Sequence, residues 1–237
     1  MHVLPPDVLL IDKPVGITSF DVVRKLQRAA RDTANPLYAR LTPHCTERGR
    51  LKCGHAGTLD PLASGLMLLG VGSGTKHLTQ LTRLDKVYEA EVCIGEKSAS
   101  GDAEGPIIAS TAAHCSEEQV SAAVATLVGT HRLQVPMYSA VKRDGEPLYK
   151  KVRRGESVAA PVRDMTVYES VLLGVVQRNA YTFATVRFHV ASGVYIRSLA
   201  EELGTRLGYP ARLENLRRTK VGPYCVKDAV WELGDKN

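Results

Sequence analysis

Two residues that could do chemistry, His55 and Asp60, lie in a glycine-rich stretch at residues 54–70. Asp60 stands directly before a proline, and an apolar run at 66–69 follows. Glycines allow sharp turns and the close approach of a ligand, while an apolar run requires burial, so this carboxylate lies where a loop meets the core. Because aspartate before proline is a common turn initiator, the pattern alone favours a structural turn over a catalytic carboxylate.

Two other patterns near this stretch fail the tests for known sites. His44, Cys45, Cys53 and His55 are metal-ligand types, but their spacing matches neither C-x2-C nor H-x3-H, so we predict no metal site. The run 70–76 is rich in glycine, yet it lacks the glycine directly before lysine and the third glycine that phosphate-binding motifs need. A nucleotide-binding enzyme is therefore disfavoured.

The composition predicts a globular, mildly basic protein. The chain of 237 residues is 44% hydrophobic, and 31 Lys and Arg against 25 Asp and Glu give a formal net charge of +6. This excess favours a polyanionic partner, although many basic proteins bind none. The N-terminus lacks the pattern of a signal peptide, and no stretch reaches membrane-spanning length. We therefore expect a cytoplasmic protein, away from membranes, with reduced cysteines.

Hydrophobic periodicity predicts the elements that position these residues. The expected strands span residues 8–11, 86–95, 181–190 and 212–220. The expected helices begin at Ser19, at about Lys76, at the capping box 116–119 and at Ile196. Ser19 is expected to cap the first helix, and Gly129 and Gly208 to end the last two. Residues 31–51 lack periodicity, which is typical of a loop.

A basic segment within the region 136–160 is the best local candidate for phosphate contact. Residues 142–154 hold six cations against Asp144 and Glu146, a net charge of +4, interleaved with tyrosines. A merely solvated charged face is the alternative. The six cations are Lys142, Arg143, Lys150, Lys151, Arg153 and Arg154.

Six separated motifs together resemble the bacterial tRNA pseudouridine synthase B family. They are, in order, residues 10–19 (L-x-D-K-P-x-G-x-T-S), 54–65, 86–88, 136–142, 193–197 and 216–218. The resemblance covers most of residues 10–226, and chance agreement falls with each independent match. It implies an α+β fold with a mixed, mostly antiparallel central sheet, flanking helices and a central RNA-binding cleft. It also implies one catalytic domain over 1–237, with 31–51 as an insertion and no C-terminal RNA-binding domain.

The resemblance implies that uridine is isomerised to pseudouridine in the T-loop of tRNA, at the position usually numbered 55, after base flipping. Asp60 matches the family's nucleophile, and both attack on ribose C1′ and attack on base C6 stay open. Tyr88 matches the tyrosine that stacks on the flipped base and transfers a proton near the sugar. Arg197 matches the arginine that pairs with the nucleophile and lowers its pKa.

Other matched residues would bind the substrate. His55 matches the histidine that fills the space left by the flipped nucleotide. Tyr195 and Leu216 match residues that line the base pocket, and Lys76 and Asp102 match polar contacts around the flipped base. No metal and no organic cofactor is implied.

Lys13 is also counted among the substrate-binding residues, because it belongs to a matching Lys-Pro pair that in the family packs near the active site.

The sequence also departs from the family pattern. Ala56 stands where the family usually has threonine, and Ala99 where an acidic residue is common. Both changes affect support around the site more than the chemistry.

The expected partner is tRNA, through its T-arm stem-loop. No protein partner is implied, and we expect a monomer, although no feature of the sequence reports the oligomeric state. Two alternatives stay open: a pseudouridine synthase for another RNA, and a non-catalytic RNA chaperone that folds tRNA. The joint presence of Asp60, Tyr88 and Arg197 disfavours the chaperone.

Overall fold

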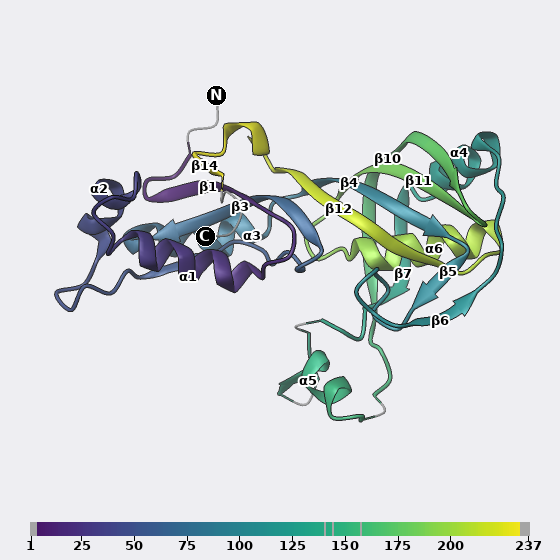
Figure 1. The fold of residues 1–237 in the computed structure, drawn as a ribbon, viewed down its shortest axis with the longest axis horizontal. Helices are drawn as coiled ribbons and strands as arrows, with labels where there is room; N and C mark the ends of the chain where they lie inside the picture. Colours follow the sequence, from purple (N-terminus) through teal and green to yellow (C-terminus); the bar gives the residue numbers. More distant parts are fainter. Residues whose placement is uncertain (1–3, 140, 144, 157, 233–237) are drawn as a thin grey trace. The chain divides into compact units, whose positions relative to one another are not determined.

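The computed structural model describes residues 4–139, 141–143, 145–156 and 158–232 (Figure 1). The chain divides into two compact units. The terminal unit holds residues 1–88 and 217–237, and the middle unit holds residues 89–216. Strands β4 (Lys86–Ile94) and β12 (Ala211–Val221) each contribute residues to both units.

The terminal unit is a sheet with helices and 3₁₀ turns around it. Its other elements are β1 (Val8–Lys13), α1 (Ser19–Ala29), α2 (Tyr38–Leu41), η1 (Thr42–His44), β2 (Cys53–His55), β3 (Ala63–Val71), η2 (Gly72–His77), α3 (Leu78–Thr82), β13 (Tyr224–Cys225), η3 (Val226–Asp228) and β14 (Trp231–Glu232). Strand β1 pairs with β3 antiparallel and with β14 parallel, and β2 pairs with β3.

Strand β3 is the buried centre of this unit. The run 66–69, predicted to need burial, has no solvent exposure, which confirms the prediction. In the antiparallel register Leu10 lies opposite Leu68, and both belong to a core cluster with Val8, Leu66 and Val221. A strand covered on both faces has a continuous apolar run in its sequence. This explains why β3 shows no alternation of apolar and polar residues.

Helix α1 has the predicted apolar stripe, but its cap differs from the prediction. Val22, Val23 and Leu26 are buried. The N-cap is Thr18, whose side chain accepts from the Asp21 backbone N–H in a capping box, while Ser19 is buried and bonded elsewhere. Adjacent threonine and serine fit the cap equally well by type, so the sequence pattern did not distinguish them.

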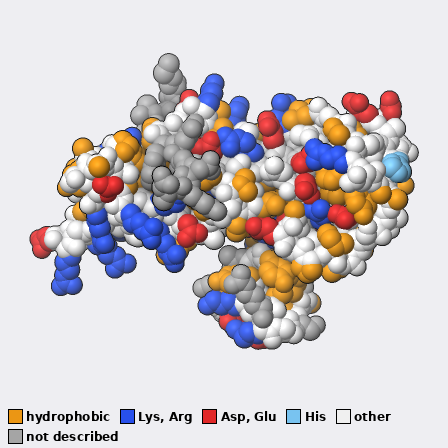
Figure 2. Space-filling view, viewed as in Figure 1, with side chains coloured by type: hydrophobic (Ala, Val, Ile, Leu, Met, Phe, Trp, Pro, Cys, Tyr) orange, Lys and Arg blue, Asp and Glu red, His pale blue; other side chains and the backbone are white. Residues whose placement is uncertain are grey.

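Two other segments of the terminal unit correct the predictions. Residues 31–51, expected as a loop, contain α2 and η1, and Leu41 and Leu51 are buried. These helical turns are too short to produce a periodic pattern. The helix expected over 76–84 is a 3₁₀ segment followed by the five-residue α3, and Lys76 lies in the former. Basic side chains of α1 and of the segment after it gather along one edge of this unit (Figure 2).

The middle unit combines an antiparallel sheet with three helices among its described residues. Its strands follow the order β12-β4-β11-β10-β7, and β5 and β6 form a small separate sheet. Helix α4 contacts β10 and α6. Its elements besides β4 and β12 are β5 (Glu96–Ser98), β6 (Ile107–Ser110), α4 (Glu117–Ala125), β7 (Gly129–Gln134), β8 (Lys142–Arg143), β9 (Glu146–Pro147), α5 (Leu148–Arg153), β10 (Val162–Arg178), β11 (Tyr181–Val190) and α6 (Ile196–Leu207).

Periodicity predicted several of these elements correctly. Alternate residues of β11 are buried, from Thr182 to Val190, and Gly208 ends α6 with φ +79°. The expected end of α4 at Gly129 is wrong, because the helix ends at Ala125 and Gly129 opens β7 with φ +116°. The mixed α+β class with a mostly antiparallel sheet is confirmed. Among the described residues, no helix has the length and apolarity needed to cross a membrane.

Gly65 offers a stability test in the terminal unit. It has φ +107°, and an added Cβ would lie 2.2 Å from the Arg218 carbonyl oxygen. Gly65→Ala therefore adds steric overlap to backbone strain, and we expect it to lower the free energy of unfolding by at least about 3 kcal/mol in urea titrations. Gly16→Ala is the control, because Gly16 has φ +87° with nothing within 4 Å of its Cβ position, and strain alone costs about 1–2 kcal/mol. Equal losses in the two variants would contradict the contact.

Candidate active site

The loop that carries Asp60 joins β2 to β3, and a buried arginine holds its first half. Arg218 is 1% exposed. Its Nη2 donates to the Gly57 carbonyl at 3.1 Å and its Nη1 to the Thr58 carbonyl at 3.5 Å, while Nε donates to the Leu66 carbonyl at 2.7 Å. One guanidinium thus joins the loop to the first buried residues of β3.

Ser19 holds the residue before the aspartate. Its hydroxyl accepts from the Leu59 backbone N–H at 2.8 Å and donates to the Leu59 carbonyl at 2.9 Å. The Ser19 side chain therefore satisfies both the N–H and the carbonyl of Leu59. This residue is buried, where unpaired polar groups are costly. The first residue of α1 consequently fixes the chain next to Asp60.

The residue after the aspartate is held by β1 and the turn that follows it. The Pro61 carbonyl accepts from the Gly16 N–H at 2.8 Å and from the Lys13 ammonium at 3.4 Å. Lys13 is fully buried, and it also donates to the carbonyls of Ile17 at 2.7 Å and Pro14 at 2.9 Å. The structure therefore places this sequence-predicted residue against the backbone of the Asp60 loop.

These contacts make the Asp60 loop rigid. Every carbonyl from Gly57 to Pro61 accepts a hydrogen bond, that of Asp60 from the Ala63 N–H at 3.1 Å. The Asp60 side chain is half-buried. A carboxylate on a loop whose carbonyls are all bonded has little freedom to leave its position, as a nucleophile requires.

Positive charge gathers beside this loop. Burial and the neighbouring Arg218 lower the pKa of His55, which favours the neutral ring at pH 7. Burial, with Arg218, lowers the pKa of Lys86 to about 8. Tyr88, two residues further along β4, is buried as the alternation predicted, whereas Lys76 is exposed on η2.

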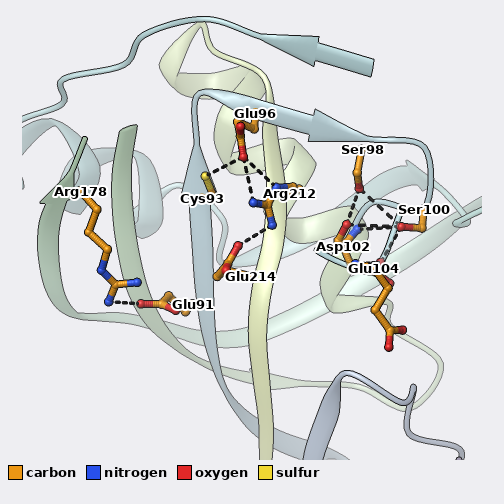
Figure 3. A network of polar contacts seen from close by, with 10 residues as sticks. All are labelled: Glu91, Cys93, Glu96, Ser98, Ser100, Asp102, Glu104, Arg178, Arg212 and Glu214. Carbon is orange, nitrogen blue, oxygen red and sulfur yellow. Dashed lines mark hydrogen bonds and ion pairs between the residues drawn. The ribbon is translucent and has the colours of Figure 1, made fainter. Parts of the chain in front are cut away.

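In the middle unit, the predicted residues Arg197 and Asp102 form a buried pair. Their side chains are each 5% exposed, and Nη1 lies 3.7 Å from Oδ2. Arg197 also donates to the Ser100 carbonyl at 2.9 Å and to the Tyr138 carbonyl at 3.0 Å. Asp102 Oδ1 in turn accepts from the Ser100 hydroxyl and from the Glu104 N–H, both in Figure 3. The guanidinium is thus fixed in orientation.

Other elements of the middle unit support this pair. Tyr195 is the N-cap residue of α6, so Arg197 lies in the first turn of the helix. The Leu213 N–H donates to the Gly101 carbonyl at 3.0 Å, which holds the Asp102 loop against β12. Leu216, three residues further along that strand, is buried.

The comparisons with known proteins decide the family. The profile of the TruB family pseudouridylate synthases (N-terminal domain) matches residues 46–196. The tRNA pseudouridine synthase B of Corynebacterium efficiens is 38% identical over 224 residues, which are 94% of this chain and 69% of that protein. This chain belongs to the TruB family. The tRNA pseudouridine synthase B of Cupriavidus metallidurans is 41% identical over 223 residues, 94% of this chain and 65% of that protein. The TruB chain studied here thus spans about two thirds of the length of these relatives.

Solved structures agree on the fold. A Cbf5-Nop10-Gar1 complex matches 95% of this TruB chain and 52% of its own chain, with a TM-score of 0.65 and 24% identity. An H/ACA RNP bound to a substrate RNA containing 2′-deoxyuridine matches 95% and 50%, with a TM-score of 0.63 and 22% identity. The pseudouridine synthase fold predicted from the motifs is confirmed.

One cation of the basic segment of this TruB chain is paired with carboxylates. Arg154 pairs with Glu146 at 2.6 Å and Glu156 at 2.7 Å, and these carboxylates raise its pKa. Arg143 is exposed and donates to the Ala159 carbonyl at 2.6 Å. Lys150 is exposed, Lys151 is half-buried, and the side chains of Lys142 and Arg153 lie outside the described residues. Phosphate contact by these six residues stays a prediction.

Two supporting residues had escaped the sequence patterns. Ser19 was assigned to a helix cap, and Arg218 lay in a matched motif without a role. A basic residue at a buried position of the alternating β12 was the available signal for Arg218. The structure brings Lys13 to the Asp60 loop and Asp102 to Arg197. Predicted pairings between residues of the two units stay predictions.

A second network in the middle unit is structural. Arg212 lies 2.8 Å from Glu96 and also pairs with Glu214 (Figure 3). Cys93 is buried beside them, and burial raises the pKa of its thiol to about 12, which keeps it protonated. Among the described residues, no group of three or more His, Cys, Asp and Glu could hold a metal ion.

The Ser19 contact is tested by Ser19→Ala. We expect the free energy of unfolding to fall by about 2 kcal/mol and amide exchange at Leu59 to accelerate, because both Leu59 groups lose their partner. The control Thr18→Ala removes the neighbouring helix cap, costs about 1 kcal/mol and leaves exchange at Leu59 unchanged. Hydrogen exchange measured by NMR separates the two; unchanged exchange at Leu59 in Ser19→Ala would contradict the contact.

Lys86 gives a test by pH. Its pKa in the folded protein, about 8, is below the ordinary 10.5 that applies to the unfolded chain. The unfolded chain therefore binds more protons between these values, so the free energy of unfolding gains a contribution that rises from about pH 8 to 10.5. Lys86→Met should remove this rise in urea titrations across that range, and Lys220→Met, at an exposed lysine, should keep it. Parallel curves for Lys86→Met and the wild type would refute the shift.

Proposed function

We propose that this TruB protein isomerises uridine to pseudouridine in the T-loop of tRNA, at position 55, with Asp60 as the nucleophile. The proposal is supported by the relatives named tRNA pseudouridine synthase B. The observation that carries it is the Asp60 loop, in which each carbonyl from Gly57 to Pro61 is bonded, four of the five by the buried side chains of Lys13, Ser19 and Arg218.

The reaction requires that the uridine be held in place, and it consumes no other reagent. The bond between ribose C1′ and base N1 breaks, and a bond between C1′ and C5 of the same base forms. C5 loses its proton and N1 ends with one, so atoms balance without oxidant, reductant or external group. The uridine must leave its stack to reach a carboxylate, and it must stay in place while the base is detached and turned. A rigid nucleophile loop serves this purpose.

We propose supporting roles for the other matched residues. Tyr88 stacks on the flipped base and transfers a proton near the sugar. Arg197 pairs with the ionised carboxylate of the nucleophile. Its bonds to Asp102, Ser100 and Tyr138 fix the orientation of its guanidinium. His55 fills the space left by the nucleotide, and its lowered pKa supports this role because a neutral ring stacks among bases without a charge to desolvate.

The remaining substrate contacts are proposed at the matched positions Lys76, Tyr195 and Leu216. The partner is the T-arm stem-loop of tRNA, and the protein acts as a monomer. Since tRNA is the proposed substrate, we place the protein in the cytoplasm.

Asp60→Asn tests the nucleophile. The amide keeps the shape of the side chain and removes its charge, so we expect pseudouridine formation in a T-arm stem-loop to fall about a thousandfold or more. Binding of the RNA and the urea midpoint should stay close to those of the wild type. The control Asp228→Asn makes the same change on an exposed residue of the terminal unit and should keep full activity. Wild-type turnover by Asp60→Asn would refute the role of Asp60.

The same assay separates the alternatives. Pseudouridine mapping of the T-arm stem-loop, of whole tRNA and of ribosomal RNA with the wild-type protein should find the product at position 55 of tRNA. Product in another RNA alone would favour a different substrate. Binding and refolding of tRNA without any product would favour the chaperone.

A further inference from the structure

The positive charge of this protein is concentrated in one segment. Residues 24–52 contain eight Lys and Arg and two Asp and Glu, a formal charge of +6. The other 208 residues contain 23 Lys and Arg and 23 Asp and Glu, so their formal net charge is zero. The whole excess therefore lies on α1 and the segment that follows it, all within the terminal unit.

Arg24 and Arg28 lie on one face of α1, and Arg31 lies in the turn after its last residue, Ala29. All three are exposed, and Arg24 and Arg28 are four residues apart, so they are neighbours on the helix surface. Together with Gln27 they line a surface groove of about 210 Å³. Three guanidinium groups and an amide present hydrogen-bond donors in fork geometry, the arrangement that suits phosphate oxygens.

A tight turn that precedes β2 in the chain extends this basic face. Residues 46–50 form a tight turn, in which the Gly49 N–H donates to the Thr46 carbonyl at 2.7 Å. The turn packs against α1, because Arg31 donates to the Gly49 carbonyl at 3.3 Å and Gln27 to the Leu51 carbonyl at 3.4 Å. The exposed side chains of Arg48, Arg50 and Lys52 therefore lie beside the end of α1. Figure 2 shows Lys and Arg side chains, in blue, gathered along one edge of the terminal unit.

These cations have few carboxylates near them. Several arginines elsewhere pair with carboxylates, as Arg206 does with Glu202 and Arg217 with Asp12. In the described part of the chain, Arg24 alone among the cations of 24–52 has a carboxylate within 4 Å, that of Asp21 at 3.4 Å. A merely solvated helix face usually carries both signs of charge. Unneutralised charge of one sign attracts a polyanion.

The surface also begins next to the candidate nucleophile. Ser19, the first residue of α1, is bonded to Leu59, the neighbour of Asp60. At about 1.5 Å per residue, Arg24 lies about 7 Å and Arg28 about 14 Å further along the helix axis. A nucleic-acid strand that presents a nucleotide at Asp60 has its next phosphates within this range.

We infer that the surface formed by Arg24, Arg28, Arg31, Arg48, Arg50 and Lys52 binds the phosphate backbone of the RNA whose uridine reaches Asp60. We name it the arginine surface. This inference rests on the proposed function. It assigns a role to the segment 31–51, which contains three of these six cations.

The test compares variants with equal losses of charge. One variant is Arg24→Gln/Arg28→Gln/Arg31→Gln, a second is Arg48→Gln/Arg50→Gln/Lys52→Gln, and the control is Arg83→Gln/Lys220→Gln/Lys227→Gln, at three exposed cations of the same unit outside the surface. Binding of whole tRNA is measured against salt concentration, and pseudouridine formation against tRNA concentration. Urea titrations confirm that each variant is folded.

For each surface variant we expect the slope of log K against log salt to fall by about 2 to 3, since each phosphate contact contributes about 0.7–0.9. We expect KM to rise about tenfold or more with kcat unchanged, because the surface binds RNA but does not touch the reacting atoms. The control should keep the wild-type slope and KM. An unchanged slope, or an equal loss in the control, would overturn the inference.

Failure of the inference and failure of the proposed function give different results. If the wild type forms pseudouridine and the surface variants match it in slope and KM, the function stands and the surface is only solvated. If the wild type forms no pseudouridine in any RNA, the proposed function fails. The salt slopes then still show whether RNA phosphates bind here, and an unchanged slope would overturn the surface as well.

Discussion

The buried guanidinium of Arg218 is the interaction on which the candidate site depends. A charged group that is 1% exposed is costly unless its donors meet acceptors, and here they meet the carbonyls of Gly57, Thr58 and Leu66. The acceptors exist only if the loop takes one particular path. The cost of burying the charge therefore enforces the conformation that presents Asp60, and replacing Arg218 with an apolar side chain would leave three carbonyls without a donor.

The middle unit uses the same principle with a second arginine. Arg197 satisfies carbonyls of Ser100 and Tyr138 and pairs with Asp102, so a segment far along the chain is held to the start of α6. In both units, a buried cation shapes a loop instead of stabilising a regular element. This explains how Asp60 and Asp102 lie on irregular backbone that is nevertheless held in place by hydrogen bonds.

Sequence patterns predicted the parts of this protein that depend on periodicity. The stripe of α1, the alternation of β11 and the burial of 66–69 follow from one face meeting a core, and each was predicted correctly. The role of Ser19 was not visible, because its partner Leu59 is 40 residues away and a cap explained its type equally well. Arg218 was missed for a related reason: its buried position in β12 could be read from the alternation, but its carbonyl partners, 152 to 161 residues away, could not.

Two groups of arginines in this TruB protein thus differ in their physics. Buried arginines are surrounded by fixed carbonyls or carboxylates, so their charge is used within the fold and little of it reaches solvent. Those of the arginine surface have few such partners, and their field extends about a Debye length, roughly 8–10 Å, into the solvent. The first group can position a nucleophile and the second can attract a polyanion towards it. The two groups meet at the start of α1, where Ser19 bonds to Leu59 and the exposed arginines begin within two turns of the helix. A strand drawn to the surface by its phosphates would therefore arrive beside the carboxylate that the buried charges hold in place.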